Sequence, residues 1–216
     1  MALKLTFIII ASYLIGSISP SVLISRAVGG FDIRSKGSGN AGTTNMLRLM
    51  GWGWGILTFA LDVLKGVICT LMGMYLLEGW GGAAAGMFAI LGHAFPLYQH
   101  FRGGKGVATA CGIMFCMHPL LTLCALATHL IISFSTRIVS LATCIVFTLM
   151  PLATFLWPAK YAQPTSALTI VVCALVLFLH RKNIQRLFTG SEKKLSIRSG
   201  NKKKKQQPCA SESRQK

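Results

Sequence analysis

Long apolar stretches separated by short polar segments dominate the chain from residue 3 to residue 180. A helix that crosses a membrane needs roughly 20 predominantly apolar residues. Two apolar stretches, Val107–Met117 and Leu120–Phe134, are shorter than that, so we expect some short or broken helices. The pattern predicts an all-α, polytopic transmembrane bundle of about seven membrane helices, with five or seven full crossings. The candidate spans are Leu3–Ser25, Trp54–Leu77, Gly82–Tyr98, Val107–Met117, Leu120–Phe134, Val139–Trp157 and Ser166–His180.

Composition supports the membrane class. Hydrophobic residues make up 53% of the 216 residues and the mean hydropathy is +0.59, whereas soluble domains carry more charge. We expect residues 1–194 to form one transmembrane domain. Residues 195–216, which include the run Lys202–Lys205, are expected to be a disordered basic cytoplasmic tail near anionic lipid headgroups.

The basic residues predict the orientation. An odd number of crossings puts the two termini on opposite sides of the membrane. All Lys and Arg residues except Lys4, Lys65 and Lys160 then fall on the side of the C-terminus. Because basic residues favour the cytoplasmic side, we expect the N-terminus outside and the C-terminus in the cytoplasm. Three polar clusters, at 101–106, 32–48 and 180–192, are then expected to meet on the cytoplasmic face.

One polar cluster is the glycine-rich loop FRGGKG at 101–106. Glycines let backbone amides approach a ligand closely, and a cation beside them favours an anion such as phosphate. A basic signal that ends a membrane helix is the alternative interpretation. The candidate binding residues here are Arg102, Gly103, Gly104, Lys105 and Gly106, with His93 upstream as a candidate base.

A second polar cluster covers residues 32–48, between the first two spans. Short hydrogen-bonding side chains alternate there with glycines, a composition that builds nests of amides around oxyanions. A turn-rich loop with helix caps is the alternative. The candidate residues are Ser38, Gly39, Asn40, Thr44, Asn45 and Arg48.

The third cluster covers residues 180–192. His180, Asn183 and Arg186 are spaced by three residues, so they can project from one side of a helix. Arg137 and Ser140, at the start of the sixth span, fall on the same side of the membrane. An interfacial helix with snorkelling arginines is the alternative, but it does not account for Asn183 or His180.

Several kinds of phosphate chemistry are excluded by the sequence. The loop is not a nucleotide-binding P-loop, because Lys105 is followed by Gly106 instead of Ser or Thr. The chain has five Asp and Glu residues in total, so we expect neither a metal site nor a cofactor. Asp62 and Lys65 lie on one face of the second span and are expected to be a structural pair. Any transfer reaction would need a substrate that arrives activated.

The polar segments resemble a known family. They read GSIS at 16–19, DIRSKGSGNAGTTN at 32–45, GHAFPLYQHFRGGKGVAT at 92–109, TRIVSLAT at 136–143 and HRKNIQRLxxGxE at 180–192, where x is any residue. The sequence resembles the acyl-phosphate-dependent glycerol-3-phosphate acyltransferases, the PlsY family of bacterial integral membrane enzymes. Thr43 stands where alanine is usual in the family, and Ser19–Pro20 varies a common motif. Neither departure removes a group expected to do chemistry.

The resemblance implies transfer of an acyl group from acyl phosphate to the 1-hydroxyl of sn-glycerol 3-phosphate, the first acylation of phospholipid synthesis. It also implies a multi-pass protein of the bacterial inner membrane, monomeric, without a nucleic-acid partner. We expect Arg48, Lys105, Ser140 and Asn183 to hold phosphates and align the hydroxyl, with His180 orienting it. Ser38, Asn40 and Asn45 are expected to line the acyl-phosphate pocket.

Two other functions remain open from the residues alone. A transporter or flippase for a phosphorylated metabolite also suits broken helices and basic loops. A non-catalytic scaffold that binds anionic headgroups is a further possibility, and it would tolerate an arginine at position 105. The clustering of charge on one face and the absence of a visible internal repeat favour the enzyme.

Overall fold

The computed structural model describes residues 1–157 and 160–195, and within these ranges its regular secondary structure is helical. The all-α expectation is confirmed. The order of elements is α1 (Ala2–Gly16), α2 (Pro20–Gly29), η1 (Ile33–Ser35), α3 (Thr43–Met50), α4 (Trp52–Ala94), η2 (Leu97–Gln99), α5 (Val107–Met117), α6 (Pro119–Thr136), α7 (Val139–Leu156), α8 (Ala162–Leu179) and α9 (Arg181–Phe188).

The first predicted span, Leu3–Ser25, is in fact two helices. α1 ends at Gly16, and α2 begins at Pro20. Proline lacks an amide hydrogen and disfavours helical backbone at the residue before it, so it tends to start a helix instead of continuing one. Ser19 accordingly has extended backbone, with φ −110° and ψ 92°.

Helix α4 reverses direction within its 43 residues. The backbone is not helical at Leu77 and Glu78, where Glu78 has φ 51°. A Cβ added at Gly73 would lie 2.7 Å from the Cβ of Ala85. Residues 12 apart in a straight helix are about 18 Å apart. The two arms, 52–76 and 79–94, therefore run antiparallel and correspond to the second and third predicted spans.

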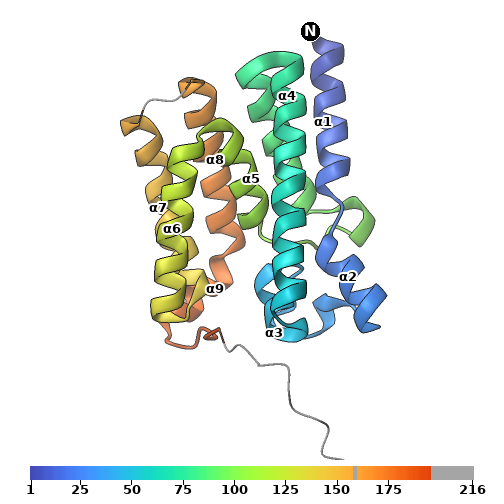
Figure 1. The fold of residues 1–216 in the computed structure, drawn as a ribbon, viewed down its shortest axis with the longest axis vertical. Coiled ribbons are helices and arrows are strands. Elements are labelled where there is room, and N and C mark those ends of the chain that lie inside the picture. The colour runs from blue at the N-terminus through green and yellow to red at the C-terminus, as the bar shows by residue number, and fades with distance from the viewer. Residues whose placement is uncertain (158–159, 196–216) are drawn as a thin grey trace, which may run out of the picture.

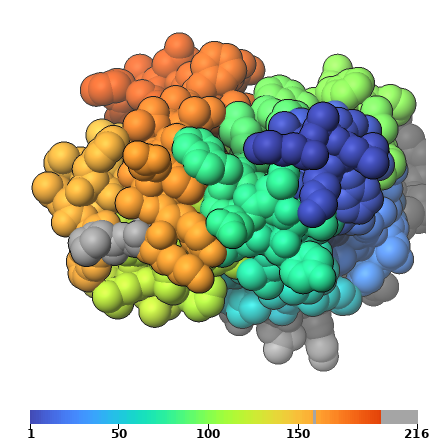
Figure 2. Space-filling view, turned by 90° about the horizontal axis from the view of Figure 1, so that it is seen from above, coloured from blue at the N-terminus to red at the C-terminus, as the bar shows by residue number. Residues whose placement is uncertain are grey.

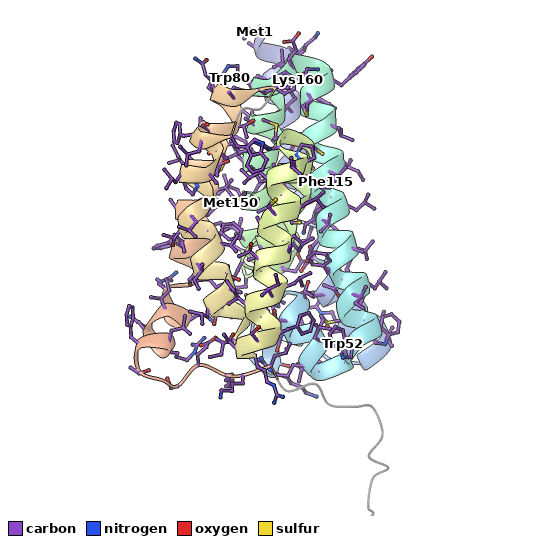
Figure 3. All side chains as sticks on the ribbon, turned by 60° about the vertical axis from the view of Figure 1, so that its left-hand side comes forward. Met1, Trp52, Trp80, Phe115, Met150 and Lys160 are labelled. Carbon is purple, nitrogen blue, oxygen red and sulfur yellow. The ribbon has the colours of Figure 1, made fainter. Side chains whose placement is uncertain are left out.

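Five helical stretches are long and apolar enough to cross a membrane, counting α1 with α2 and both arms of α4 with η2 as single stretches. α5 is a shorter apolar helix. Figure 3 shows Trp80 and Lys160 near one end of the bundle and Trp52 near the other. Tryptophan is typical of membrane–water interfaces, so Trp80 and Trp52 mark the expected two surfaces of the membrane. The number of crossings and their sidedness stay predictions.

Glycines let the central helices approach closely. A Cβ at Gly16 would collide with the carbonyl oxygen of Ala89, and one at Gly112 with that of Val63. These positions join α1 to the second arm of α4, and α5 to the first arm. Close approach at small residues is the usual way for membrane helices to pack.

The two ends of the bundle differ. The N-terminus lies at the end where α4 reverses, and α2, α3 and α9 gather at the opposite end (Figure 1). Viewed from the N-terminal end, the first residues sit beside the α4 reversal (Figure 2). The polar clusters at 32–48 and 180–192 thus lie at the end away from the N-terminus, and the glycine-rich loop lies nearer the middle, beside the junction of α1 and α2 (Figure 1). Of the expected tail at 195–216, only Leu195 is described; residues 196–216 lie outside the described residues.

Candidate active site

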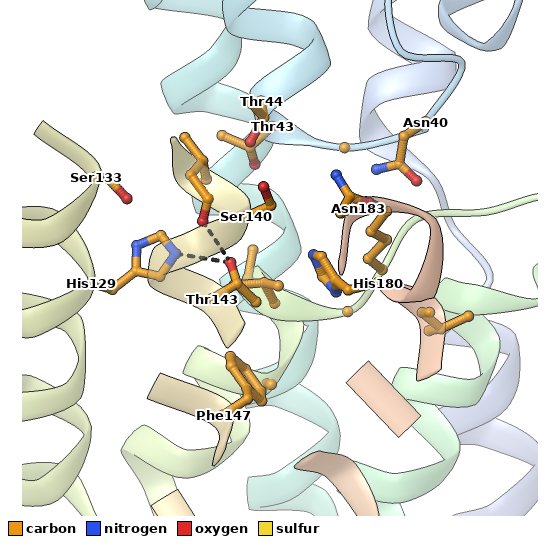
Figure 4. Close-up of a pocket in the computed structure, with 18 of the residues that line it drawn as sticks. Asn40, Thr43, Thr44, His129, Ser133, Ser140, Thr143, Phe147, His180 and Asn183 are labelled. Carbon is orange, nitrogen blue, oxygen red and sulfur yellow. Dashed lines mark hydrogen bonds between the residues drawn. The ribbon is translucent and has the colours of Figure 1, made fainter. Parts of the chain in front are cut away.

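A single cavity of about 970 Å³ joins the three polar clusters to the apolar interior. Its polar mouth, defined here as the lining residues within 37–48, 102–107, Ser140 and 180–193, lies at the end away from the N-terminus. Its deeper part is lined by α4, α5, α6, α7 and α8. In Figure 4, Ser140, His180 and Asn183 lie near one another, with Asn40, Thr43 and Thr44 across from them. A charged mouth continuous with an apolar chamber suits a ligand that has both an anionic head and an acyl chain.

The loop at 32–45 is held by an arginine clamp. The carboxylate of Asp32 accepts from the amide and the guanidinium of Arg34 at 2.7–2.9 Å. Hydrogen bonds from Arg34 hold the pKa of Asp32 well below its usual range, against the opposing effect of burial. Arg34 also donates to the carbonyl oxygens of Gln99 (2.8 Å) and Arg102 (3.1 Å). The clamp therefore ties the polar cluster at 32–48 to the glycine-rich loop.

Asn45 organises this loop from inside. Its side chain, 1% exposed, accepts from the amide of Ser38 (2.9 Å) and donates toward the carbonyls of Ile33, Lys36 and Asn40 at 3.0–3.1 Å. These bonds occupy both ends of the amide group. Asn45 lines the cavity, but its polar atoms shape the loop instead of facing a ligand.

The glycine-rich loop differs from the expectation at two positions. The amide of Gly103 donates to Ala94 (3.2 Å), and the amide of Gly104 to His93 (3.0 Å). Both amides therefore complete the end of α4 and are not available to a phosphate. A Cβ at either glycine would collide with His93, so the glycines serve close packing. Gly104 is also absent from the cavity lining.

Gly106 keeps the predicted role open. It has φ +81°, a left-handed conformation that favours glycine, and it directly precedes α5. The first turn of α5, including Val107 and Ala108, lines the cavity. The amides of a helix's first turn have no partner within the helix and carry a partial positive charge. The start of α5 is thus suited to bind an anion beside Lys105.

Asp62, Lys65 and His93 form a buried hub under the loops, each no more than 6% exposed. Lys65 Nζ lies 2.7 Å from Asp62 Oδ1 and 2.8 Å from His93 Nδ1. It also donates to the carbonyls of Gly16 (3.1 Å) and Ile18 (2.9 Å), where α1 ends. The expected structural pair is therefore a three-residue network that joins α1, α4 and the base of the glycine-rich loop.

Lys105, Asn183 and Ser140 form a hydrogen-bonded chain that converges on Glu192. The ammonium of Lys105 donates to Asn183 Oδ1. Asn183 Nδ2 (2.6 Å) and Ser140 Oγ (2.8 Å) donate to Glu192 Oε1, and Arg186 Nε donates to Oε2 (2.6 Å). The network brings together three of the residues predicted to handle phosphate.

Burial shapes the pKa values in the mouth. Burial opposes the ionisation of Glu192, but hydrogen bonds from Arg186, Asn183 and Ser140 lower its pKa below the ordinary value. Burial lowers the pKa of Lys105 to about 8, with nearby Glu192 acting in the opposite direction. Lys105 remains mostly cationic at neutral pH, and Glu192 is an anion.

His180 is held in one tautomer. Its Nδ1 lies 2.8 Å from the carbonyl oxygen of Val176, which can only accept, so Nδ1 carries the hydrogen. Burial, and then the charge of Lys105, lower the pKa of His180 to about 4. The ring is therefore neutral at physiological pH, and Nε2 is left as an acceptor in the wall of the cavity.

Most residues predicted from the sequence line this one cavity. Arg137 does not; it ends α6 with φ 60°, and its carbonyl accepts from the amide of Leu195 at 2.6 Å. Through this hydrogen bond the backbone of Arg137 holds the segment that follows α9. The predicted residues in the lining are Ser38, Gly39, Asn40, Thr44, Asn45, Arg48, His93, Arg102, Gly103, Lys105, Gly106, Ser140, His180 and Asn183.

Sequence reasoning gave no role to two lining residues. Glu192 is the one acidic residue within 180–194, a signal that it balances the surrounding cations. His129 lies in an apolar span, where an ionisable residue indicates function or a buried partner. Its Nε2 is 3.1 Å from Thr143 Oγ1. Figure 4 marks this hydrogen bond with a dashed line.

Comparison with known proteins identifies the family. Residues 6–190 match the family described as glycerol-3-phosphate acyltransferase. The chain is 42% identical over 193 residues to the glycerol-3-phosphate acyltransferase of Halalkalibacterium halodurans, covering 87% of this chain and 94% of that one. It is 38% identical over 192 residues to the enzyme of Aquifex aeolicus, covering 88% and 98%.

Solved structures agree. The crystal structure of PlsY, an integral membrane glycerol 3-phosphate acyltransferase, in its glycerol 3-phosphate form superposes with a TM-score of 0.83 at 37% identity, covering 89% of this chain and 96% of that one. Its lysophosphatidic acid form gives a TM-score of 0.80 at 36% identity, with the same coverage. The chain is a multi-pass membrane protein and belongs to the PlsY family of glycerol-3-phosphate acyltransferases.

Proposed function

We propose that this enzyme transfers an acyl group from acyl phosphate to the 1-hydroxyl of sn-glycerol 3-phosphate, releasing lysophosphatidic acid and phosphate. The observation that carries the proposal is the single cavity that joins a cationic mouth to an apolar chamber. The glycerol 3-phosphate and lysophosphatidic acid forms of the related crystal structures support the acceptor and the product. These relatives favour the acyltransferase over a transporter.

The leaving group sets the chemistry. Acyl phosphate is a mixed anhydride, so the attacking hydroxyl needs positioning and charge stabilisation more than a strong base. In our proposal Lys105, Arg48 and the first turn of α5 hold phosphate oxygens. As the new ester bond forms and the acyl–phosphate bond breaks, the departing phosphate carries the negative charge beside these groups.

The acceptor is oriented by side chains next to Lys105 in the same mouth. We assign the glycerol hydroxyl to the neighbourhood of Ser140, Asn183 and His180, with the free Nε2 of His180 accepting its hydrogen bond. The low pKa of His180 makes it a weak base, so we assign final removal of the proton to a phosphate oxygen. Ser38 and Asn40 border the same space.

The cellular setting follows from charge. We propose that the enzyme lies in the bacterial inner membrane and opens its site to the cytoplasm, because most Lys and Arg residues in the described part of the chain fall on the side of the mouth. We also propose that it is monomeric. Both phosphorylated substrates would reach the mouth from that side. No resident metal or cofactor is needed for the proposed transfer.

The test is phosphate release by the purified enzyme from palmitoyl phosphate, with and without glycerol 3-phosphate and with no metal added. The proposal predicts release that depends on glycerol 3-phosphate, with lysophosphatidic acid formed in equal amount by mass spectrometry. Folded protein that shows no turnover, but moves glycerol 3-phosphate across proteoliposomes, would support the transporter instead.

A further inference from the structure

Helix α9 has two faces of different character. Its inner face carries Asn183, which is 9% exposed and joins the hydrogen-bonded chain between Lys105 and Glu192. Residues spaced four and three apart lie along one side of a helix. The opposite, exposed side of α9 is formed by Arg181, Gln185 and Phe188. We call these three residues the outer face of α9. One eight-residue helix thus joins the active site to an exposed surface.

Arg181 marks the level at which the outer face meets the membrane. Its guanidinium carbon lies 4.4 Å from the centre of the Phe178 ring, and Nη1 donates to the carbonyl oxygen of Phe178 at 3.1 Å. Phe178 is 58% exposed and belongs to the last turn of α8, which is long and apolar enough to cross a membrane. Its ring therefore faces the space that the bilayer fills. An arginine stacked on such a ring lies at the level of the lipid headgroups.

The outer face has a charge and an aromatic ring to offer to a ligand. Arg181 is absent from the ion pairs formed among the described residues. A guanidinium has five N–H donors, so the bond to the Phe178 carbonyl leaves most of them free for an anion. Phe188 is 89% exposed, and so large an apolar surface is more stable against lipid than against water. A helix face that combines cations with aromatic rings is typical of helices that lie at a membrane surface.

We propose that the outer face of α9, together with Phe178, binds an anionic phospholipid, with the lipid phosphate at Arg181 and an acyl chain against the Phe178 ring. A lipid with net negative charge is favoured over a zwitterionic one, because the cationic headgroup of the latter opposes attraction to arginine. The exposed Lys182 and Lys193 flank this surface and add to the attraction.

The bound lipid acts on the reaction through the other face of the helix, and this part of the inference rests on the proposed function. An isolated helix of eight residues is marginal in water, so α9 depends on its tertiary contacts. Asn183 lies on its inner face, and His180 directly precedes its first residue. A lipid that holds the outer face therefore favours the arrangement in which Asn183 and His180 face the substrates. We expect anionic phospholipid to raise kcat.

The test compares nanodiscs of phosphatidylcholine alone with nanodiscs that also contain phosphatidylglycerol, which is anionic. Native mass spectrometry of the enzyme taken from the discs counts the retained lipids and needs no turnover. Phosphate release at saturating palmitoyl phosphate and glycerol 3-phosphate gives kcat. An anionic surface repels glycerol 3-phosphate and raises its KM whatever α9 does, so kcat is the informative constant.

Arg181→Gln and Lys182→Gln form a matched pair, since each removes one exposed cation from α9 but only Arg181 lies on the outer face. Arg181→Gln should weaken retention of phosphatidylglycerol about fivefold, as for one cation lost at an anionic surface. It should also abolish the rise in kcat, which we expect to be roughly fivefold in wild type. Lys182→Gln should match wild type in both readouts. Arg181→Lys should keep part of the retention, because lysine keeps the charge but lacks the planar group that stacks on Phe178.

Equal losses in Arg181→Gln and Lys182→Gln would overturn the site, because general attraction by basic residues would then explain the binding. Equal retention of the two lipids by wild type would also overturn it, and selective retention without a change in kcat would overturn the coupling. If Arg181→Gln fails to fold, Phe188→Ala carries the same prediction, with Phe155→Ala as the control because Phe155 is exposed on α7. Selective retention by wild-type enzyme that shows no turnover would contradict the proposed function but not the lipid site.

Discussion

Lys105 is expected to set the alkaline limb of the pH–rate profile. Its ammonium is needed as a cation for phosphate, and burial lowers its pKa to about 8. The Lys105 side chain is a cation below about pH 8 and becomes neutral above it. One pH unit above the pKa only about a tenth of the enzyme keeps the charge, equivalent to about 1.4 kcal/mol of lost binding. We therefore expect kcat/KM to fall about tenfold between pH 7 and pH 9.

The assay is phosphate release from palmitoyl phosphate at limiting substrate, corrected for hydrolysis without enzyme at each pH. His180, with a pKa of about 4, stays neutral over this range. The second ionisation of substrate phosphate has a pKa near 6, so it is mostly complete by pH 7 and does not mask the limb. Lys105→Arg keeps its charge and should have a lower plateau without the alkaline fall. A flat wild-type profile up to pH 9.5, or the same limb in the arginine variant, would refute the reasoning.

Three further predictions follow from the geometry. His180→Ala should lower kcat roughly 100-fold, as for loss of a group that orients a proton, and steady-state kinetics showing an unchanged kcat would remove it from the reaction. Asp62→Asn should destabilise the fold by about 3–5 kcal/mol, because it leaves Lys65 as an unpaired buried charge. Asp62→Asn/Lys65→Met should recover part of that loss in thermal unfolding, and no recovery would argue against the pair. Gly104→Ala should reduce both activity and stability, because the added Cβ would collide with the imidazole of His93. Gly53→Ala, where the added Cβ meets open space, should have little effect on either. Equal effects of the two substitutions on phosphate release and thermal unfolding would contradict the packing role of Gly104.

The architecture was largely predictable because it depends on apolar length. The apolar stretches located the α4 reversal correctly, since they break between Leu77 and Gly82. The break between α1 and α2 was missed, because Ser17–Ser19 is a short interruption by small residues, and serine is common within membrane helices. Pro20 was the available signal, since proline commonly begins a helix.

Most of the cavity lining was predictable from the sequence, but its hydrogen bonds were not. Polar residue types at the membrane edge identified the cavity lining, because phosphate recognition requires cations and small donors. Hydrogen-bond partners depend on how the chain folds back on itself, so the sequence did not show that the side-chain amide of Asn45 donates to the carbonyl oxygens of Ile33 and Lys36. For the same reason the amides of Gly103 and Gly104 were wrongly expected to face phosphate.

The most direct test of the account is the rate of phosphate release by Lys105→Ala, compared with wild type and with Lys160→Ala. Lys160 is an exposed lysine near the opposite end of the bundle (Figure 3). Loss of a charge-assisted hydrogen bond costs about 1.5–3 kcal/mol, so kcat/KM should fall roughly 10- to 150-fold in Lys105→Ala. Lys160→Ala should match wild type. A folded Lys105→Ala enzyme with wild-type kcat/KM would contradict the assignment of this mouth as the phosphate site.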